Sequence, residues 1–289
     1  MSHLFICLTV DRIAPGDTVG YMFEEIRQVT GKQDGPISII LAGVHGDEKC
    51  GVKALQKIMP SLEIECGTVY WGYGNLPAIE KEVRFTEVNL NRMFIELIVK
   101  EADKTSYEYK RAQHLKPYLE KADVLLDLHA SSIPDGRAFA ICESNAADIV
   151  KYLPVDLVVS GFDDVEPGAT DGYMNSIGKI GICLECGYLS NEKSDDIAEK
   201  SLLAFLKARG HISGEISRQE QSHICMYTIG YSGTDNFRLT RPFDNFEKIE
   251  AGQLIGMDGQ QEIRASKPSY ILFAHNADKI GDEIFLLGE

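Results

Sequence analysis

Short apolar runs alternate with amphipathic segments along the first two thirds of the chain. The clearest run, residues 37–43, carries no charged side chain, as expected of a strand that is buried on both faces. Other runs rich in β-branched, aromatic or small apolar residues follow it. This pattern predicts strands at 37–43, 68–73, 122–129, 138–142, 155–160 and 180–185.

Three helices are predicted between these strands. Val52 and Leu55 begin an apolar repeat at helical spacing, and Pro60 ends that segment. Residues 107–121 also have a helical pattern, although it contains a proline. Residues 195–209 form an amphipathic helix with its apolar side chains on one side.

Alternating strands and helices predict an α/β fold with a mixed, mainly parallel sheet flanked by helices. Residues 78–92 are polar and predicted to be irregular. The pattern of apolar and polar residues changes after residue 212. Residues 213–221 form a charged, polar linker, and residues 222–289 contain short β-like runs without a helix. We therefore predict a catalytic domain at 1–212 and a small all-β domain at 222–289.

The composition adds limits on location and partners. The net charge of -15 argues against nucleic acid or an anionic membrane as the main partner. No apolar run is long enough to span a bilayer, and residues 1–10 resemble a first strand more than a signal peptide. Seven cysteines, an odd number, fit reduced thiols in a cytoplasmic protein.

The candidate chemistry lies where three predicted strands end. His45 and Glu48 follow the first strand, His129 closes the third, and Glu185 closes another. Since ligands bind at the carboxyl ends of parallel strands, these side chains can converge in space. Two histidines and a carboxylate suit Zn²⁺, and a further carboxylate can move protons. Taken singly, each histidine is more often structural, and His-x-x-Glu is a weak motif.

Four motifs taken together are more specific. They are GVHGDE at 43–48, NLNRMF at 89–94, DLH at 127–129 and LECG at 184–187. In this order they resemble the succinylglutamate desuccinylase/aspartoacylase family, which belongs with the zinc carboxypeptidases. The resemblance covers roughly residues 37–190, and a small C-terminal β domain is also similar to that family's layout.

The resemblance implies roles for individual residues. One Zn²⁺ per chain would be bound by His45, Glu48 and His129, and Glu185 would be the general base and acid. Arg84 would polarise the scissile carbonyl, because a fixed guanidinium stabilises a developing oxyanion. The substrate carboxylate would be held by Asn91 and Arg92. Alternatively, Arg84 is a solvated surface arginine, and Arg92 forms a structural ion pair with an acid of residues 80–87.

Two departures from the family pattern concern the metal surroundings and the substrate. Asn89 stands where the family usually has Asp, and Asn175 stands where aspartoacylases have an arginine that grips the substrate side-chain carboxylate. We expect Asn175 to line the substrate pocket with Asp171 and Tyr173, which argues against N-acetylaspartate as the substrate. Arg137 is a possible replacement for the missing charge or an ordinary loop arginine.

These features predict a zinc-dependent hydrolase that cleaves the amide bond of an N-acyl amino acid. One alternative is a metallocarboxypeptidase acting on a small peptide or cell-wall fragment. Another is a non-catalytic relative that binds a metabolite. The expected partner in each case is a small molecule or short peptide, and a homo-oligomer is possible.

Overall fold

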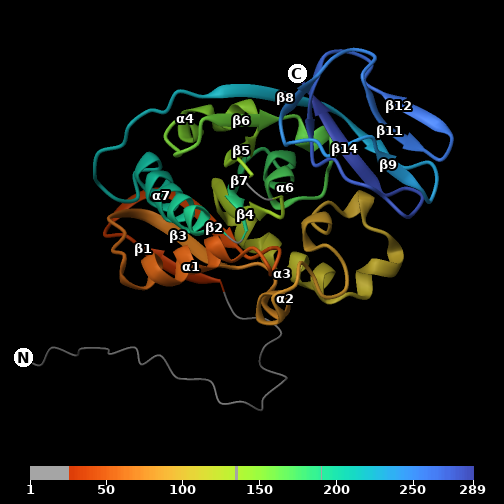
Figure 1. Cartoon of the computed structure of the whole chain (residues 1–289). Coiled ribbons are helices and arrows are strands. Elements are labelled where there is room, and N and C mark those ends of the chain that lie inside the picture. Colours follow the sequence, from red (N-terminus) through yellow and green to blue (C-terminus); the bar gives the residue numbers. More distant parts are fainter. Residues whose placement is uncertain (1–25, 134–135, 190) are drawn as a thin grey trace, which may run out of the picture.

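The computed structural model describes residues 26–133, 136–189 and 191–289 (Figure 1). The strand predicted within residues 1–10 lies outside this part of the chain. Eleven of the described strands form one sheet in the order β1-β3-β2-β4-β7-β5-β6-β8-β14-β13-β10. Its first seven members are β1 (Arg27–Thr30), β3 (Cys66–Tyr73), β2 (Gln33–Ala42), β4 (Val124–Ser131), β7 (Ile180–Tyr188), β5 (Phe139–Cys142) and β6 (Leu157–Ser160).

The middle of the sheet is parallel. Strand β2 pairs in parallel with β3 and β4, and β4 pairs in parallel with β7. Strands β1 and β5 run antiparallel to β3 and β7. This arrangement confirms the predicted α/β class with a mixed, mainly parallel sheet, and it brings the carboxyl ends of β2, β4 and β7 to one edge.

Helices cover both faces of this sheet because each has one apolar side. On one face, α1 (Lys49–Ile58) and α7 (Glu192–Ala208) bury residues such as Leu55 and Phe205. On the other face, α3 (Tyr107–Lys121) buries Leu115 beside Met174 of α6 (Thr170–Ser176). The three predicted helices are confirmed. No helix in the described ranges is long and apolar enough to cross a membrane.

The prediction of an irregular segment at 78–92 was wrong in part. Helix α2 (Leu76–Lys81) extends into this segment, and Asn75 caps it by accepting a hydrogen bond from Ala78 N at 3.3 Å. Pro77 lies in the first helical turn, where its missing N–H costs nothing. The remaining short helices are η2 (Met59–Ser61), η3 (Leu90–Arg92), η4 (Glu96–Ile98), η5 (Glu101–Thr105), η6 (Ser144–Ala146), α4 (Ala147–Val150) and α5 (Phe162–Val165).

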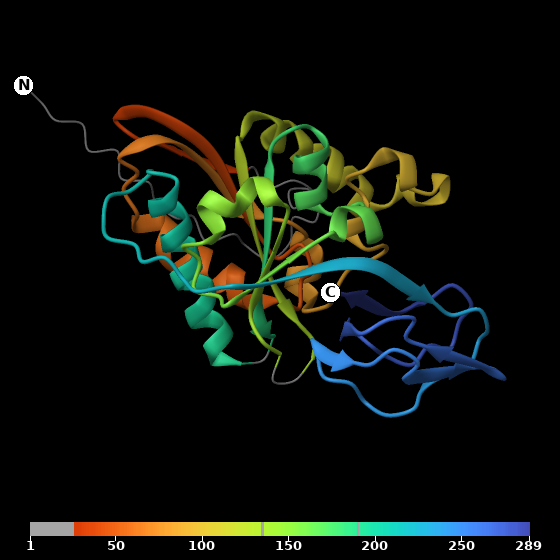
Figure 2. The ribbon, with the colours of Figure 1, turned by 90° about the horizontal axis from the view of Figure 1, so that it is seen from above.

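The C-terminal region is joined to the main sheet by the long strand β8 (Ser222–Tyr231), which Figure 2 shows crossing the molecule. The first part of β8 pairs with β6, and its second part pairs with β14. The predicted all-β character is confirmed, although the division at 212 and 222 stays a prediction. The other strands are β9 (Phe237–Leu239), β10 (Glu247–Ile249), β11 (Leu254–Asp258), β12 (Gln261–Arg264), β13 (Ser269–Leu272) and β14 (Glu283–Gly288), with β12-β11-β9 forming a second sheet.

A buried carboxylate fixes the loop between α2 and η3. Glu108 Oε1 accepts hydrogen bonds from Asn75 Nδ2 at 3.1 Å and from Thr86 N at 2.8 Å and Oγ1 at 2.7 Å. Burial opposes ionisation of Glu108, but these hydrogen bonds outweigh it and lower its pKa. The loop that carries Arg84 and Asn89 is therefore anchored to α3.

We expect Glu108→Ala to lower the free energy of unfolding by about 3 kcal/mol, because it leaves several buried donors without an acceptor. Urea denaturation monitored by circular dichroism measures the change. The control is Glu101→Ala, which removes an exposed ion pair to Lys104 and should change stability by less than about 0.5 kcal/mol. Equal stability of both variants would contradict the anchoring role of Glu108.

Candidate functional site

The turn after β2 delivers two polar side chains to the carboxyl edge of the sheet. Gly43 has a φ of +67°, which favours glycine. At Gly46, a Cβ atom would lie 2.0 Å from the backbone carbon of Ala78, so a side chain cannot fit. This close approach lets His45 and Glu48 leave the turn directly beside α2.

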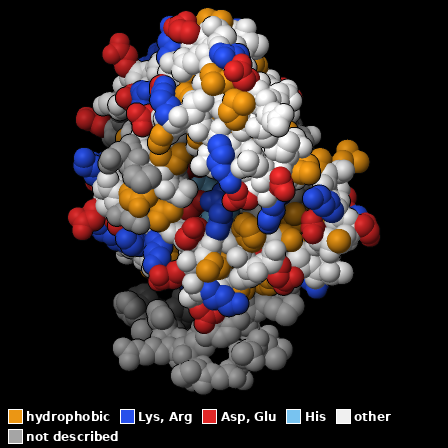
Figure 3. Space-filling view, turned by 45° about the vertical axis from the view of Figure 1, so that its right-hand side comes forward, with side chains coloured by type: hydrophobic (Ala, Val, Ile, Leu, Met, Phe, Trp, Pro, Cys, Tyr) orange, Lys and Arg blue, Asp and Glu red, His pale blue; other side chains and the backbone are white. Residues whose placement is uncertain are grey.

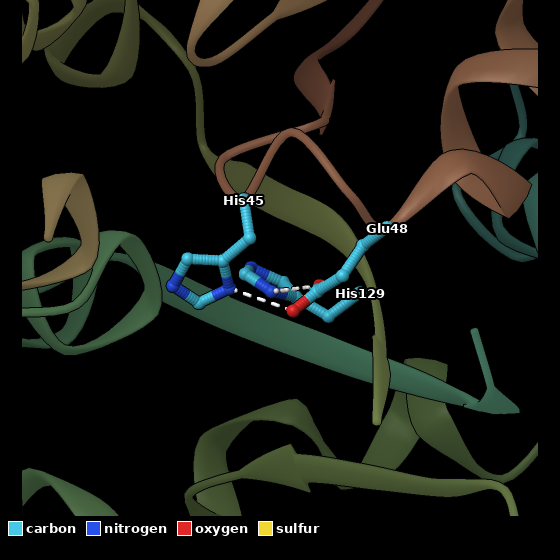
Figure 4. Close-up of side chains that lie close together, drawn as sticks. All are labelled: His45, Glu48 and His129. Atoms are coloured by element: carbon cyan, nitrogen blue, oxygen red, sulfur yellow. Dashed lines mark hydrogen bonds and ion pairs between the residues drawn. The ribbon is translucent and has the colours of Figure 1, made fainter. Parts of the chain in front are cut away.

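His45, Glu48 and His129 point toward one another (Figure 4). His45 Nδ1 lies 2.8 Å from Glu48 Oε1, and His129 Nδ1 lies 2.9 Å from Glu48 Oε2. The ligand atoms of the three residues all lie within 4.8 Å of one another, and all three side chains are buried. Strand β4 supplies His129, so residues far apart in the sequence meet at one point.

Each histidine has a second contact on its outer nitrogen. His45 Nε2 lies 3.0 Å from Asn89 Oδ1, and His129 Nε2 lies 3.1 Å from Asp127 Oδ2. An oxygen acceptor at Nε2 favours the tautomer that keeps the proton there, which leaves Nδ1 free to bind a metal. Asn89 therefore still provides an acceptor although the family pattern has Asp at this position.

The cluster is electrostatically coupled. Burial opposes ionisation of Glu48, yet the two histidines hold its pKa well below the usual range. Burial also disfavours charged His129, but Asp127 and Glu48 raise its pKa well above the ordinary value. For His45, burial dominates and the pKa is lowered. Glu48 is thus an anion, as a metal ligand must be.

The donor set fits a divalent cation. Two imidazole nitrogens and one carboxylate oxygen are ligands that catalytic zinc sites use, with a further position open for water or substrate. The inward nitrogens converge on one carboxylate, and the outer nitrogens have oxygen partners. His45, Glu48 and His129 could therefore hold a metal ion.

Glu185 adjoins this cluster on strand β7, opposite His129 in the sheet register. One of its ligand atoms lies within 4.8 Å of ligand atoms of His129 and Cys183. Its Oε2 atom is buried and has no hydrogen-bond partner among the described residues. Burial, and then the negative charge of Glu48, raise the pKa of Glu185 to about 7. A carboxyl group with such a pKa can exchange protons near neutral pH.

Arg84 reaches the cluster from the loop after α2. Its Nη1 donates to Glu48 Oε1 at 3.0 Å, while 48% of its side chain is exposed. It is therefore both solvent-accessible and paired with Glu48. Figure 3 shows histidine side chains at the bottom of a hollow in this face of the molecule, next to Lys or Arg side chains.

A family model now bears directly on this arrangement. The model described as the succinylglutamate desuccinylase/aspartoacylase catalytic domain matches residues 34–209, more than half of the chain. The chain belongs to the succinylglutamate desuccinylase/aspartoacylase family. The matched range contains every predicted site residue, from His45 to Glu185.

Individual relatives agree with this membership. A succinylglutamate desuccinylase from Pseudoalteromonas atlantica is 29% identical over 85 residues, which are 27% of this chain and only 24% of that protein. The fold is similar to succinylglutamate desuccinylase from Vibrio cholerae, with a TM-score of 0.75, 20% identity, and 88% of this chain and 81% of that chain covered. It is also similar to the product-bound ectoine utilization protein EutE (DoeB) from Ruegeria pomeroyi, with a TM-score of 0.68, 22% identity, and 89% and 86% covered.

In this member of the desuccinylase/aspartoacylase family, Asn91 and Arg92 lie on η3 and already have protein partners. Arg92 Nη2 forms an ion pair with Glu166, and its Nη1 donates to Asn91 O. One alternative expected this acid to come from residues 80–87. Glu166 instead lies in the segment after α5. Asn91 Oδ1 accepts a hydrogen bond from Thr170 N at 3.3 Å.

Asn175 and Arg137 are used by the fold. Asn175 Nδ2 donates to Asp163 Oδ2 at 2.9 Å, and its Oδ1 accepts from Gly181 N at 3.1 Å and from Asn145 at 3.3 Å. These bonds fasten α6 to β7, so both ends of the amide are committed to the protein. Arg137 donates to Asp156 Oδ1 at 2.8 Å. None of these contacts reaches the metal-ligand cluster.

Sequence reasoning missed two residues beside the cluster, Asp127 and Thr170. Asp127 precedes His129 by two positions on a strand, so the period of two places both on the same face. The DLH motif at 127–129 already contains this spacing of two. Thr170 had no sequence signal, because its donation to Asp127 Oδ2 at 2.5 Å depends on how α6 packs against β4.

Proposed function

We propose that the protein is a zinc-dependent hydrolase that cleaves the amide bond of an N-acyl amino acid. The observation that carries the proposal is the buried His45–Glu48–His129 cluster with the unpaired Oε2 of Glu185 beside it, in a member of this family. The named relatives that act on succinylglutamate support the substrate class.

In this proposal His45, Glu48 and His129 hold one Zn²⁺. The bound cation would act as a Lewis acid and lower the pKa of water. Glu185 takes a proton from the attacking water as its oxygen bonds to the acyl carbon. Glu185 then gives that proton to the amine nitrogen as the C–N bond breaks, which leaves a free amine and a carboxylic acid that loses its own proton to solvent.

Arg84 and Arg92 have different roles in this proposal. Arg84 stabilises the negative charge that develops on the carbonyl oxygen, since its guanidinium already faces the ligand Glu48. Arg92, held by Glu166, binds the substrate carboxylate with Asn91, because a planar guanidinium matches a carboxylate in geometry and charge. Asn175 supports the pocket through β7 and not by touching the substrate.

We expect Arg84→Ala to lower kcat by about 10²–10³-fold, the usual cost of losing one oxyanion donor. KM should change much less, because the charge that Arg84 stabilises develops only in the transition state. Arg84→Lys should recover part of the rate, since it restores the positive charge. Steady-state kinetics would contradict the assignment if Arg84→Ala raised KM alone.

The direct test of the function combines metal analysis with a substrate screen. Purified protein is analysed for zinc by mass spectrometry, and release of free amine is followed for a panel of N-acetyl and N-succinyl amino acids. About one zinc per chain and hydrolysis of at least one panel member are expected. Release of C-terminal residues from peptides, with no activity on the panel, would instead favour a metallocarboxypeptidase.

A further inference from the structure

A closed ring of polar contacts, two of them made by backbone N–H groups, links the two histidines to the segment that carries Asn91. Starting at His45, the ring passes through Asn89 Oδ1, which also accepts from Asn91 N at 3.0 Å. Asn91 Oδ1 accepts from Thr170 N at 3.3 Å. The remaining contacts run through Thr170, Asp127, His129 and Glu48 back to His45.

Thr170 is the member of this ring that joins its two halves. It is fully buried at the start of α6, and it uses two different groups. Its backbone N–H bonds to Asn91, while its hydroxyl donates to Asp127 Oδ2 at 2.5 Å. Without Thr170, the contacts of Asn91 and of Asp127 would be connected in this ring only by way of His45 and Glu48.

We propose that Thr170 is a positioning residue for the metal centre. By donating to Asp127, its hydroxyl fixes the carboxylate whose Oδ2 lies 3.1 Å from His129 Nε2, and this contact in turn orients the imidazole whose Nδ1 faces Glu48. The inference rests on the proposed metal centre and extends it to a residue outside the ligand set.

The surroundings of Asp127 explain why loss of the Thr170 hydroxyl alone should weaken metal binding. Asp127 is completely buried, and its Oδ1 atom has no hydrogen-bond partner among the described residues. Its Oδ2 atom carries both contacts, to Thr170 and to His129. Loss of the hydroxyl leaves His129 as the remaining polar contact of this carboxylate, and the carboxylate is then free to turn. Partners of this kind typically change metal affinity about 10–100-fold.

Thr170 also sets the orientation of the Asn91 amide. Because the Thr170 N–H is a donor, Asn91 must present its oxygen there, and its Nδ2 group faces the other way. This contact uses the backbone, so it survives any substitution at position 170 that preserves the helix start. The hydroxyl and the backbone can therefore be tested separately.

The test compares Thr170→Val, which keeps the shape and the backbone N–H, with Thr170→Ser, which keeps the hydroxyl. Zinc affinity of each metal-depleted protein is measured by competition with a chromophoric chelator. We expect zinc to bind about 10–100-fold more weakly to Thr170→Val and within about threefold of wild type to Thr170→Ser. At saturating zinc, KM of Thr170→Val should stay near the wild-type value, because the Asn91 contact remains.

Ser176→Ala is the matched control, because its hydroxyl donates to Tyr173 O at the far end of the same helix. It should bind zinc like wild type. Asp127→Asn supplies a double-mutant cycle in which Thr170→Val adds little further loss. If Thr170→Val does not fold, Thr170→Ala replaces it with the same expectation.

The outcomes separate the two proposals. Failure of wild type to bind zinc would overturn the metal centre itself. If wild type binds zinc and folded Thr170→Val binds it equally tightly, only the role of Thr170 is overturned. Equal weakening in Thr170→Ser and Thr170→Val would also overturn it, because the hydroxyl would then be irrelevant.

Discussion

Replacement of Glu185 by Gln is expected to lower kcat/KM by about 10²–10⁴-fold, the range typical for loss of a general acid–base group. Gln keeps the shape of the side chain but cannot accept and return a proton. Binding of zinc and of substrate should persist, since Glu185 is not in the proposed ligand set. Hydrolysis is measured by amine release, and zinc content by mass spectrometry.

The pH dependence of the same reaction follows from the raised pKa of Glu185. In the metal-free protein burial and Glu48 raise this pKa to about 7, so the deprotonated base is present above pH 7 and lost below it. A nearby cation favours the carboxylate and lowers the pKa. We therefore expect kcat/KM to rise with pH along an acidic limb below pH 7, and the limb to disappear in Glu185→Gln.

Glu185→Gln should lower the rate of hydrolysis but raise the stability of the metal-free protein. A carboxyl group whose folded pKa is raised costs stability once it ionises, from its unfolded pKa upward. Glu185→Gln without metal should therefore unfold at a higher temperature than wild type at pH 8, with little difference at pH 4. The exposed Glu192→Gln should alter neither rate nor unfolding temperature. Near-normal hydrolysis by Glu185→Gln would rule out the proposed proton transfer.

Removal of the metal is expected to abolish hydrolysis, and addition of zinc to restore it. The reason is that the bound cation would lower the pKa of the attacking water and act as a Lewis acid, which Glu185 and Arg84 cannot do in its place. Chelation should also lower the unfolding temperature, because a ligand at 100 times its dissociation constant stabilises a protein by about 2.7 kcal/mol. At zinc concentrations that saturate wild type, His129→Ala should be inactive and should unfold at the lower temperature of the chelated protein.

Zinc affinity should increase with pH. His129 lies between Asp127 and Glu48, and its pKa is raised well above the ordinary value despite burial. Zinc needs neutral imidazole, so binding displaces this proton, which is present below the raised pKa. Calorimetry in buffers of different ionisation enthalpy counts the protons released. Full hydrolysis in the presence of excess chelator would contradict a metal-dependent reaction.

Local patterns in the sequence were sufficient for most of the fold. Mainly apolar runs predicted the central strands, because a strand buried on both faces is covered by apolar neighbours. Helical spacing predicted α1, α3 and α7. The pattern failed at α2, because the polar character of residues 78–92 hid a short helix whose first turn holds Pro77.

Long-range pairing decided what local patterns left open. The sequence separated residues 222–289 as a β region, but only the tertiary structure joins it to the main sheet, through β8 pairing with β6. Similarly, the partner of Arg92 is Glu166, which lies 74 positions along the chain. No periodicity encodes such a pair, since it depends on how two loops pack together.

For the candidate site, the sequence by itself determined the residue types and their places at strand ends. His45, Glu48, His129 and Glu185 could be selected because parallel strands end at one edge of a sheet. Only the tertiary structure decided which nitrogens face Glu48, that Asn175 is committed to the fold, and that Thr170 bonds to Asp127. The physical reason is that hydrogen bonds need alignment within a few tenths of an ångström, which packing sets and sequence spacing does not.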